Sequence, residues 1–389
     1  MIYDPEGDCD DVADRCRLAI SRIGCLREGG GDRVRAIAVP SFRSVDTMPN
    51  RDQLQQGTDV MKLVFIGASH WHLSLYLDPA LEVPGAQVVG ISDPDPDLVA
   101  SLSEKLGCVG NTDFRALCRE TKPDFVFALG RHSDMVEEAH FLIEEGIPFA
   151  LEKPCGLNAQ DVAALAALEA RRGGFSSVPL VFRNGDFAAR LREMSAKGIQ
   201  YMTYRFIAGF AARYQQANCH WMLDPRSSGG GCTINLAPHF FDLALLLMGD
   251  RVRVRHATMS NAAWGHPIED YSVVTLERDA DICVIETGYL YPAPTSSFDM
   301  HYAVRSPTQY LVAHDPETVE VVRNSGEREM IRSLTTNVPH YRTFVFDVLD
   351  RVRKGQPPLA RIADMVPIMR LIDDAYDKAG PLVGKIASK

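Results

Sequence analysis

The chain is organised around the stretch GGGCTINLAPHFFD at residues 229–242 and the apolar run that follows it. The second half of this stretch predicts a helix that is apolar nearly all round and is therefore buried. Asn235, His239 and Asp242 are its polar exceptions, and their i, i+4, i+7 spacing predicts that all three share one helix face. Pro238 suits the first helical turn, where a missing N–H costs nothing.

His239 is thus expected near the N-terminal end of a buried helix. The positive end of the helix dipole disfavours imidazolium there, and a neutral imidazole in a dry cleft is a candidate general base. The glycines before it would let the backbone approach a ligand closely. The alternative is a core helix with three satisfied polar residues behind a flexible turn, and this stretch alone does not decide between the two.

A second candidate is the lysine of PFALEKP at residues 148–154, where a short apolar strand ends in a charged pair and a proline. Lysine is scarce in this chain, with nine among the 41 basic residues, so Lys153 at the end of a buried strand stands out. The alternative is a surface lysine paired with Glu152.

Composition bounds the class of protein. The 389 residues suffice for two domains, and 46% hydrophobic with 24% charged residues is ordinary for a globular chain. A net charge of −10 without a basic run argues against nucleic acid or an anionic membrane as partner. No secretory signal or bilayer-length apolar run is visible. Nine cysteines without CxxC or Cys/His pairing indicate reduced thiols, a cytoplasmic location and no metal site.

Residues 1–60 differ from the rest of the chain. They contain no lysine, eight arginines and eleven acidic residues, with few helix or strand patterns. We expect either a mis-assigned upstream extension, with Met61 as the true start, or a disordered tail.

Residues 61–180 alternate between apolar strands and helices. Continuous apolar strands between helices predict a parallel, doubly wound sheet, whose ligand crevice lies at the C-terminal strand ends. Gly67, Asp93, Gly130 and Lys153 all fall at such ends. The expected strands are 62–66, 87–91, 108–110, 124–129 and 149–152, and the expected helices begin or lie at 71–77, 99–106, 114–119, 135–145 and 159–170.

The first strand is followed by GASHWH rather than by G-x-G-x-x-G. Gly67 keeps the tight turn, Ser69 is small enough to admit a pyrophosphate, and His72 replaces the glycine that permits close helix–strand packing. Asp93 ends the second strand, where it could accept from a ribose 2′-hydroxyl and repel a 2′-phosphate, which favours NAD over NADP. Its alternative is a simple turn residue.

Residues 181–389 predict an α+β domain with a large open, mostly antiparallel sheet. The expected strands are 199–206, 252–259, 271–277, 282–291, 299–304 and 319–322, with closing helices at 341–353 and 363–379. Between the first strand and the glycine turn, residues 213–226 form a loop with large amphipathic and charged groups, including Trp221, Asp224 and Arg226. Such a loop could line a polyol pocket, or it could be ordinary surface packing.

The Glu152-Lys153-Pro154 motif, combined with the glycine turn, Asn235 and His239, resembles the glucose–fructose oxidoreductase/inositol dehydrogenase (Gfo/Idh/MocA) family over residues 61–389. The resemblance implies a Rossmann domain, a C-terminal domain whose open sheet often forms a subunit interface, and NAD(P)-linked oxidation or reduction of sugars and polyols. It implies that Lys153 is the active-site lysine and His239 the proton donor or acceptor.

Three positions depart from the family pattern. The glycine fingerprint is incomplete, Gly130-Arg131-His132 replaces Thr-Pro-Asn after the fourth strand, and Asn235 replaces an aspartate four residues before the histidine. The expected site therefore consists of catalytic, cofactor and substrate groups. The catalytic set is Lys153, His239 and Asn235; the cofactor set is Gly67, Ser69, His70, Asp93, Gly130, His132, Glu152 and Lys153; the substrate set is Trp221, Asp224, Arg226, Asn235 and His239.

The sequence thus predicts an NAD(P)-dependent oxidoreductase acting on a sugar, polyol or related carbinol or ketone, with NAD as the favoured cofactor and a homo-oligomer formed through the C-terminal sheet. Two alternatives stay open. One is an enzyme of the same family that cleaves glycosides with bound NAD, and the other is a non-catalytic regulator that binds sugar and dinucleotide.

Overall fold

The computed structural model describes residues 60–196, 198–292 and 298–382. The expected extension at residues 1–60 lies outside the described residues, except for Val60.

The first domain is built on a parallel six-stranded sheet with the strand order β3-β2-β1-β4-β5-β6. This order reverses direction between β1 and β4, and the predicted doubly wound sheet is confirmed. The strands are β1 Met61–Ile66, β2 Ala86–Ser92, β3 Val109–Gly110, β4 Phe125–Ala128, β5 Phe149–Leu151 and β6 Ser176–Ser177. The helices between them are α2 Leu73–Glu82, α3 Pro96–Leu106, α4 Phe114–Thr121, α5 Met135–Glu144 and α6 Ala159–Arg172.

Alternate residues of β1 enter different hydrophobic cores on the two sheet faces. Leu63 and Phe65 pack with residues of α2 and of the later helix α12, Val338–Lys354. Val64 and Ile66 pack with residues of α4, α5 and α6. Because successive strand side chains point to opposite faces, a run of buried apolar residues is what a sheet covered on both sides requires.

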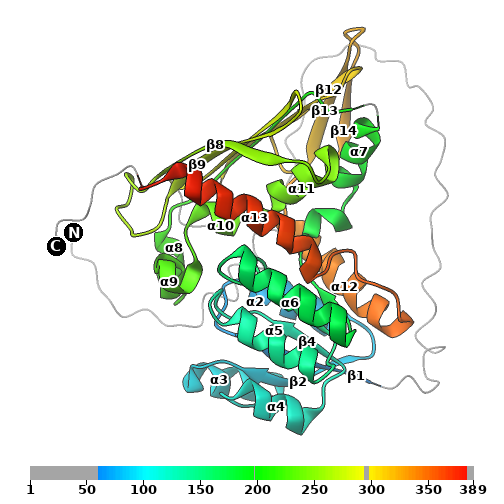
Figure 1. Cartoon of the computed structure of the whole chain (residues 1–389). Helices are drawn as coiled ribbons and strands as arrows, with labels where there is room; N and C mark the ends of the chain where they lie inside the picture. The colour runs from blue at the N-terminus through cyan, green and yellow to red at the C-terminus, as the bar shows by residue number, and fades with distance from the viewer. Residues whose placement is uncertain (1–59, 197, 293–297, 383–389) are drawn as a thin grey trace, which may run out of the picture. The chain divides into compact units, whose positions relative to one another are not determined.

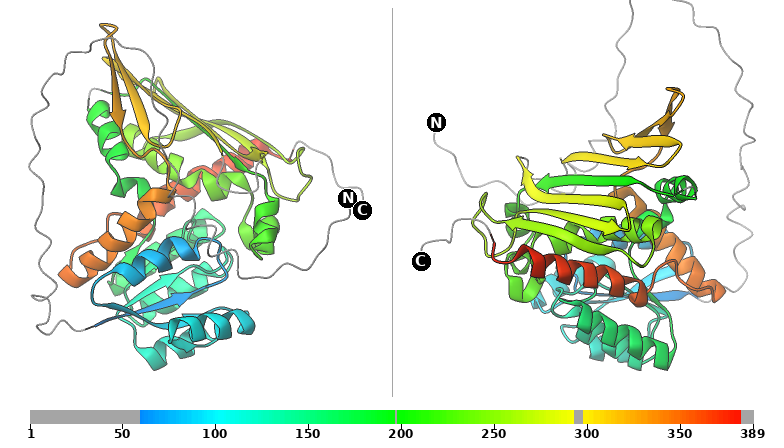
Figure 2. Two further views of the ribbon diagram at one scale, coloured as in Figure 1. Left: turned by 180° about the vertical axis from the view of Figure 1, so that it is seen from behind. Right: turned by 45° about the horizontal axis from the view of Figure 1, so that its top comes forward.

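The second domain contains an eight-stranded sheet with the order β14-β13-β12-β11-β7-β10-β9-β8, whose strands lie side by side in Figure 2. Only the central pair of β7 and β10 is parallel among the pairings in the described chain, so the predicted mostly antiparallel sheet is confirmed. The strands are β7 Tyr201–Gly209, β8 Arg253–Ser260, β9 Tyr271–Arg278, β10 Asp281–Tyr291, β11 Asp299–Arg305, β12 Gln309–Ala313, β13 Thr318–Arg323 and β14 Arg328–Arg332.

In chain order, helical segments precede the first strand of this sheet, lie between β7 and β8, and follow the last strand (Figure 1). The last helix, α13 Ile362–Ala379, contacts both β8 and α6 and so joins the two domains. The other helical segments are η3 Val181–Asn184, α7 Asp186–Ser195, α8 Ala212–Gln216, η4 His220–Leu223, α9 Pro225–Ser228, α10 Cys232–Leu236 and α11 Pro238–Met248.

The stretch that organises the sequence forms two helices rather than the single helix predicted. Asn235 belongs to α10 and His239 to α11, and the helical segments on either side of Ala237 are bent by 52°. Pro238 has no N–H to continue the ladder of α10, which explains the break. The prediction that α11 is a buried helix is confirmed, since nine of its residues are buried.

Asp242, the third polar residue of that stretch, has a structural partner. Its carboxylate accepts from Nε and Nη2 of Arg183, at 3.1 and 2.6 Å, and Arg183 also donates to Asp364 at 3.0 Å. Burial raises the pKa of Asp242, and the Arg183 guanidinium opposes that shift. Arg183 therefore links η3, α11 and α13.

The glycine turn before α10, residues 229–231, is held by hydrogen bonds and close packing against other parts of the protein. The carboxylate of Glu269 accepts from the N–H groups of Gly231 and Thr233, at 2.9 and 2.8 Å, and from the Tyr376 hydroxyl at 2.8 Å. A Cβ at Gly231 would overlap the backbone oxygen of Glu269. Glycine is needed here because the turn packs directly on another segment of backbone.

Within the described residues, no single helix is long and apolar enough to cross a membrane. The bent pair Pro225–Leu236 and Pro238–Met248 meets the length and composition criteria only when taken together.

Candidate active site

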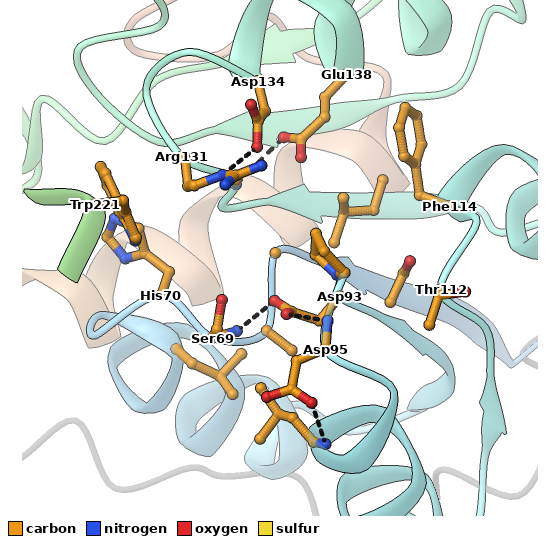
Figure 3. A pocket seen from close by; sticks show the side chains of 18 of the residues that line it. Ser69, His70, Asp93, Asp95, Thr112, Phe114, Arg131, Asp134, Glu138 and Trp221 are labelled. Atoms are coloured by element: carbon orange, nitrogen blue, oxygen red, sulfur yellow. Dashed lines mark hydrogen bonds and ion pairs between the residues drawn. The ribbon is translucent and has the colours of Figure 1, made fainter. Parts of the chain in front are cut away.

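A cleft of about 1260 Å³ opens at the C-terminal ends of β1, β2 and β4, where the sequence placed the ligand crevice. Its walls come from the loops that follow these strands and from the 217–221 segment of the second domain. Figure 3 shows Ser69 and Asp93 on one side of this space and Arg131, Asp134 and Glu138 across from them.

The loop after β1 is held in a fixed shape by Asp93. The backbone N–H of Ser69 donates to Asp93 Oδ2 at 2.7 Å, and the N–H of Asp95 donates to Oδ1 at 3.0 Å. Gly67 has a φ of 73°, and a Cβ there would overlap the backbone of Gly130. The one glycine kept from the fingerprint is thus the one whose position excludes any side chain.

These features fit a dinucleotide. The α2 N-terminus follows the tight loop at Gly67, as a pyrophosphate site requires, and its first turn carries no acidic residue. Asp93 and Asp95 line the adjoining part of the cleft and could accept from ribose hydroxyls. Asp93 is buried and already accepts two backbone N–H groups, so Asp95 is the more exposed acceptor of the two.

Gly130 makes room for a buried acid. A Cβ at Gly130 would overlap the carboxylate of Glu138, which accepts from the Gly130 N–H at 3.3 Å. Glu138 lines the cleft. Burial, followed by the charges of Asp134 and Asp93, raises the pKa of Glu138 to about 8. The carboxyl is therefore largely protonated at neutral pH and can donate a hydrogen bond toward the cleft.

The structure places the predicted aromatic and imidazole groups around the mouth of the cleft. His70 and Trp221 both line it, with ring centroids 5.7 Å apart. His132 does not line it; its ring lies 5.0 Å from that of Trp221, and its Nδ1 lies 2.7 Å from the Ser228 carbonyl. Burial lowers the pKa of both histidines, that of His132 to about 3. Both rings are therefore neutral at physiological pH.

Glu152 is buried and joins the two motifs instead of lining the cleft. Its Oε1 accepts from His72 Nδ1, and Tyr341 donates to the same oxygen at 3.4 Å. Burial alone would raise the pKa of Glu152, but His72 and Lys153 hold it well below its ordinary value. The histidine that replaces the last fingerprint glycine thus ties the β1 loop to the Glu-Lys-Pro segment.

Lys153 reaches Asn235 across the boundary between the domains. Its Nζ donates to the backbone oxygen and to Oδ1 of Asn235, both at 2.9 Å. An ammonium has three N–H donors, so one remains for another acceptor. Burial lowers the pKa of Lys153, while Glu152 raises it and Arg213 lowers it further. The Lys153-Pro154 bond is cis.

The side chain of Asn235 is fully engaged. Its Nδ2 donates to the hydroxyls of Tyr214 and Tyr289, at 2.7 and 2.9 Å. None of the hydrogen bonds of Asn235 in the described structure reaches His239. The hydrogen bonds of Asn235 instead connect it to Lys153, another member of the predicted catalytic set.

His239 lies in a second cavity beside Lys153 and Asn235. The imidazole is buried, and neither ring nitrogen has a hydrogen-bond partner among the described residues. Burial and then the Lys153 charge lower the pKa of His239 to about 3. The neutral state expected from the sequence is confirmed, but its main cause is burial rather than the helix dipole.

This second cavity is small, at about 20 Å³, which is room for roughly one water molecule. Trp71 lines both this cavity and the larger cleft, so its indole separates them. A sugar can reach His239 only if lining side chains such as Trp71 move.

Two predicted substrate residues lie elsewhere. Asp224 accepts from the Arg226 N–H at 3.1 Å and so caps α9, and both side chains are exposed. Neither lines either cavity, and their substrate role remains a prediction. The described residues contain no cluster of three or more His, Cys, Asp or Glu side chains suited to a metal ion.

The sequence interpretation missed Trp71 and Tyr289 and left Tyr214 inside a general loop. The sequence did mark Trp71 as unusual, since a large aromatic side chain is unexpected in a phosphate-binding loop that normally carries glycines. Tyr289 carried none, because it is one residue of an apolar strand and only the pairing of β10 brings it to Asn235.

Family models match both domains. Residues 61–179 match the oxidoreductase family with an NAD-binding Rossmann fold, and residues 192–304 match the GFO/IDH/MocA C-terminal domain. Together these matches cover more than half of the chain. The chain therefore belongs to the Gfo/Idh/MocA family of oxidoreductases, and its first domain is the NAD-binding Rossmann domain of that family.

One curated relative is “Putative oxidoreductase YteT” of Bacillus subtilis (strain 168), which is 23% identical over 208 residues. That match spans about half of either protein, 48% of this chain and 46% of YteT.

Solved structures share the fold at low identity. An Agrobacterium radiobacter oxidoreductase in complex with NAD+, L-tartaric acid and magnesium has a TM-score of 0.71 and 17% identity, covering 82% of this chain and 96% of that one. Levoglucosan dehydrogenase with NADH and levoglucosan has a TM-score of 0.71 and 14% identity, covering 82% and 97%. KijD10, a 3-ketoreductase from Actinomadura kijaniata with NADP and TDP-benzene, has a TM-score of 0.69 and 15% identity, covering 82% and 98%.

Proposed function

We propose that this protein is an NAD(P)-dependent dehydrogenase or reductase that interconverts a carbinol and a ketone on a sugar, polyol or related compound. The observation that carries the proposal is the pairing of Lys153 and neutral His239 in one cavity, separated by Trp71 from a cleft that fits a dinucleotide. Family membership and the ligands of the structural neighbours point to the same chemistry.

His239 and Lys153 have different roles in the proposed reaction. His239 can accept the hydroxyl proton of a carbinol because its ring is neutral, so one nitrogen is an acceptor, and neither nitrogen is bonded to another described residue. The third N–H of Lys153 would donate to the reacting oxygen and stabilise alkoxide charge as it develops. When bound, the nicotinamide dinucleotide supplies the acceptor or donor of the two electrons. Asn235 holds the lysine without neutralising its charge.

The proposed cofactor is NAD in preference to NADP. Asp93 and Asp95 both line the cleft after β2, and two carboxylates would repel a 2′-phosphate. Arg115 also lines this part of the cleft, but it pairs with Glu137.

Native mass spectrometry of the purified protein, followed by a NADH-formation assay on neutral and acidic sugars, tests the proposal. Co-purified or added NAD should bind with a stoichiometry of about one, and at least one compound should give NADH. Dinucleotide binding without turnover of any carbinol would instead favour a non-catalytic regulator, and release of a free sugar from a glycoside would favour the NAD-dependent cleaving enzyme.

We also propose a cytoplasmic homo-oligomer formed through the eight-stranded sheet. Two apolar side chains on this sheet, Tyr201 and Ile282, are 37% and 41% exposed. A second copy of the chain that packed on this sheet would bury them. Light scattering after gel filtration checks this assembly, and an Ile282→Asp variant should shift it toward the monomer.

A further inference from the structure

Arg213 is a partly buried cation without an acidic partner among the described residues. Its Nη2 donates to the Tyr214 hydroxyl at 2.8 Å, and its Nε is buried with no partner. In the part of the chain that the structure describes, no carboxylate lies within ion-pair distance of it, and the groups that raise its pKa are Tyr214 and Tyr289. By contrast, the buried Arg183 pairs with both Asp242 and Asp364. Burying a charge without a counterion costs free energy of folding. A bound anionic ligand would supply the counterion that the protein does not give Arg213.

Aromatic rings surround the guanidinium. Its central carbon lies 4.8 Å from the ring centroid of Tyr214, 5.3 Å from that of Tyr289 and 5.7 Å from that of Trp71. Rings stabilise a guanidinium through its flat faces and leave its edge for in-plane hydrogen bonds. Nε has no hydrogen-bond partner among the described residues, so it can donate to a carboxylate oxygen that approaches in the plane of the guanidinium.

The position of Arg213 ties it to the proposed reaction site. Tyr214 binds both Arg213 and Asn235, and Asn235 binds Lys153. Trp71, which Arg213 contacts, lines the cavity that contains His239, and its indole Nε1 has no hydrogen-bond partner in the described structure. The unpartnered nitrogens of Arg213 and Trp71 are both hydrogen-bond donors. Arg213 itself lines neither the dinucleotide cleft nor the cavity that contains His239, and Trp71 is the residue that contacts it and lines both.

We infer that Arg213 recognises a carboxylate on the substrate, so that the protein acts on a sugar acid rather than on a neutral sugar. This inference rests on the proposed function, because it names the substrate class of the same site. The carboxylate accepts a hydrogen bond from Nε of Arg213 while the reacting carbinol lies at Lys153 and His239. Trp71 moves to admit the substrate and can donate its indole N–H to the same anion.

Matched pairs of compounds test the inference: D-gluconate with D-glucitol, D-glucuronate with D-glucose, and D-galacturonate with D-galactose. Calorimetry with the NAD-loaded protein measures binding, and NADH formation measures turnover. In at least one pair the acid should be favoured by about 100-fold, the effect expected when a buried charge pair is made or lost. Arg213→Gln should reduce that preference to less than about 10-fold, Arg213→Lys should retain part of it, and the distant, exposed Arg332→Gln should retain all of it.

The outcomes separate the two proposals. Arginine-dependent binding of an acid without NADH formation would uphold the carboxylate site and contradict the dehydrogenase. Turnover of neutral polyols at equal efficiency, or a preference for the acid that survives in Arg213→Lys and Arg213→Gln, would overturn the carboxylate site and leave the dehydrogenase standing. Preference for D-glucose 6-phosphate, or weaker NAD binding by Arg213→Gln, would also overturn it. If Arg213→Gln does not fold, an unchanged preference in Arg213→Lys is sufficient to reject it.

Discussion

The ammonium of Lys153 lies 2.9 Å from both oxygens of Asn235, the backbone carbonyl and the side-chain Oδ1. Asn235 in turn donates to two tyrosine hydroxyls. The neutral amide therefore orients the lysine through two acceptors and adds no negative charge beside it. An aspartate at this position would keep the acceptors, add a negative charge and lose both donors.

Asn235→Asp should therefore act mainly on Lys153. A carboxylate beside the ammonium favours the charged form, so the pKa of Lys153 should rise from its lowered value. The basic limb of the kcat/KM profile should move upward in pH. A pH–rate profile of both forms on one substrate measures this, and a shift confined to the acidic limb would show that position 235 acts on His239 instead.

Cofactor choice depends on the two carboxylates after β2. The unchanged protein should bind NAD at least about tenfold more tightly than NADP, since the two carboxylates repel the 2′-phosphate that only NADP carries. Asp95→Ser should reduce this ratio with the β1 loop intact, because Asp93, not Asp95, holds the Ser69 N–H. Fluorescence titration with each cofactor gives the ratio. Tighter NADP binding by the unchanged protein would exclude the assigned role.

The buried carboxyl of Glu138 should make stability depend on pH. Its pKa is raised from 4.5 to about 8 in the folded chain. Between these pH values the folded chain keeps a proton that the unfolded chain releases, so the free energy of unfolding falls as pH rises from 4.5 to 8.

Glu138→Gln removes this titration. The variant should match the unchanged protein near pH 5 and become more stable than it toward pH 8, by a few kcal/mol at about 1.4 kcal/mol per pKa unit. Urea unfolding across this range checks the difference. A stability difference that is the same at every pH would mean that Glu138 is not the titrating group.

The ion pair between Arg183 and Asp242 should contribute strongly to folding. Arg183→Ala leaves a buried carboxylate unpaired and should lower the free energy of unfolding by roughly 3–5 kcal/mol. Arg190→Ala is a matched control, because its pair with Asp186 is exposed and should contribute less than about 1 kcal/mol. Equal effects in urea unfolding would contradict this role for Arg183.

The first domain could be predicted because its strands are continuous apolar runs punctuated by helices, and each face of such a sheet needs a cover. The second domain was harder to predict from the sequence. Strand 328–332 was not predicted, because β14 lies at the edge of the sheet, is largely exposed and carries little apolar pattern. Strand 309–313 and helix 186–195 were not predicted either. The parallel pairing of β7 with β10 joins strands distant in sequence and leaves no local signal.

The site was predictable where a residue type is unusual for its place, as with Lys153 at the end of a buried strand and Gly67 in a tight turn. It was not predictable where long-range packing decides the partner. Asn235 and His239 seemed to share one helix face, yet the break at Pro238 directs Asn235 to Lys153. The glycine turn suggested a ligand and instead packs on Glu269.

The central claim is that Lys153 stabilises the reacting oxygen of a carbinol bound beside a nicotinamide cofactor. The most direct test is the turnover number of Lys153→Ala, measured as NADH formation with the carbinol that the unchanged protein oxidises fastest. Lys105→Ala, an exposed lysine of α3, is the control. We expect kcat to fall by about 100-fold or more in Lys153→Ala and to stay unchanged in the control, with NAD affinity preserved in both. Full turnover by a folded, NAD-binding Lys153→Ala variant would contradict the claim.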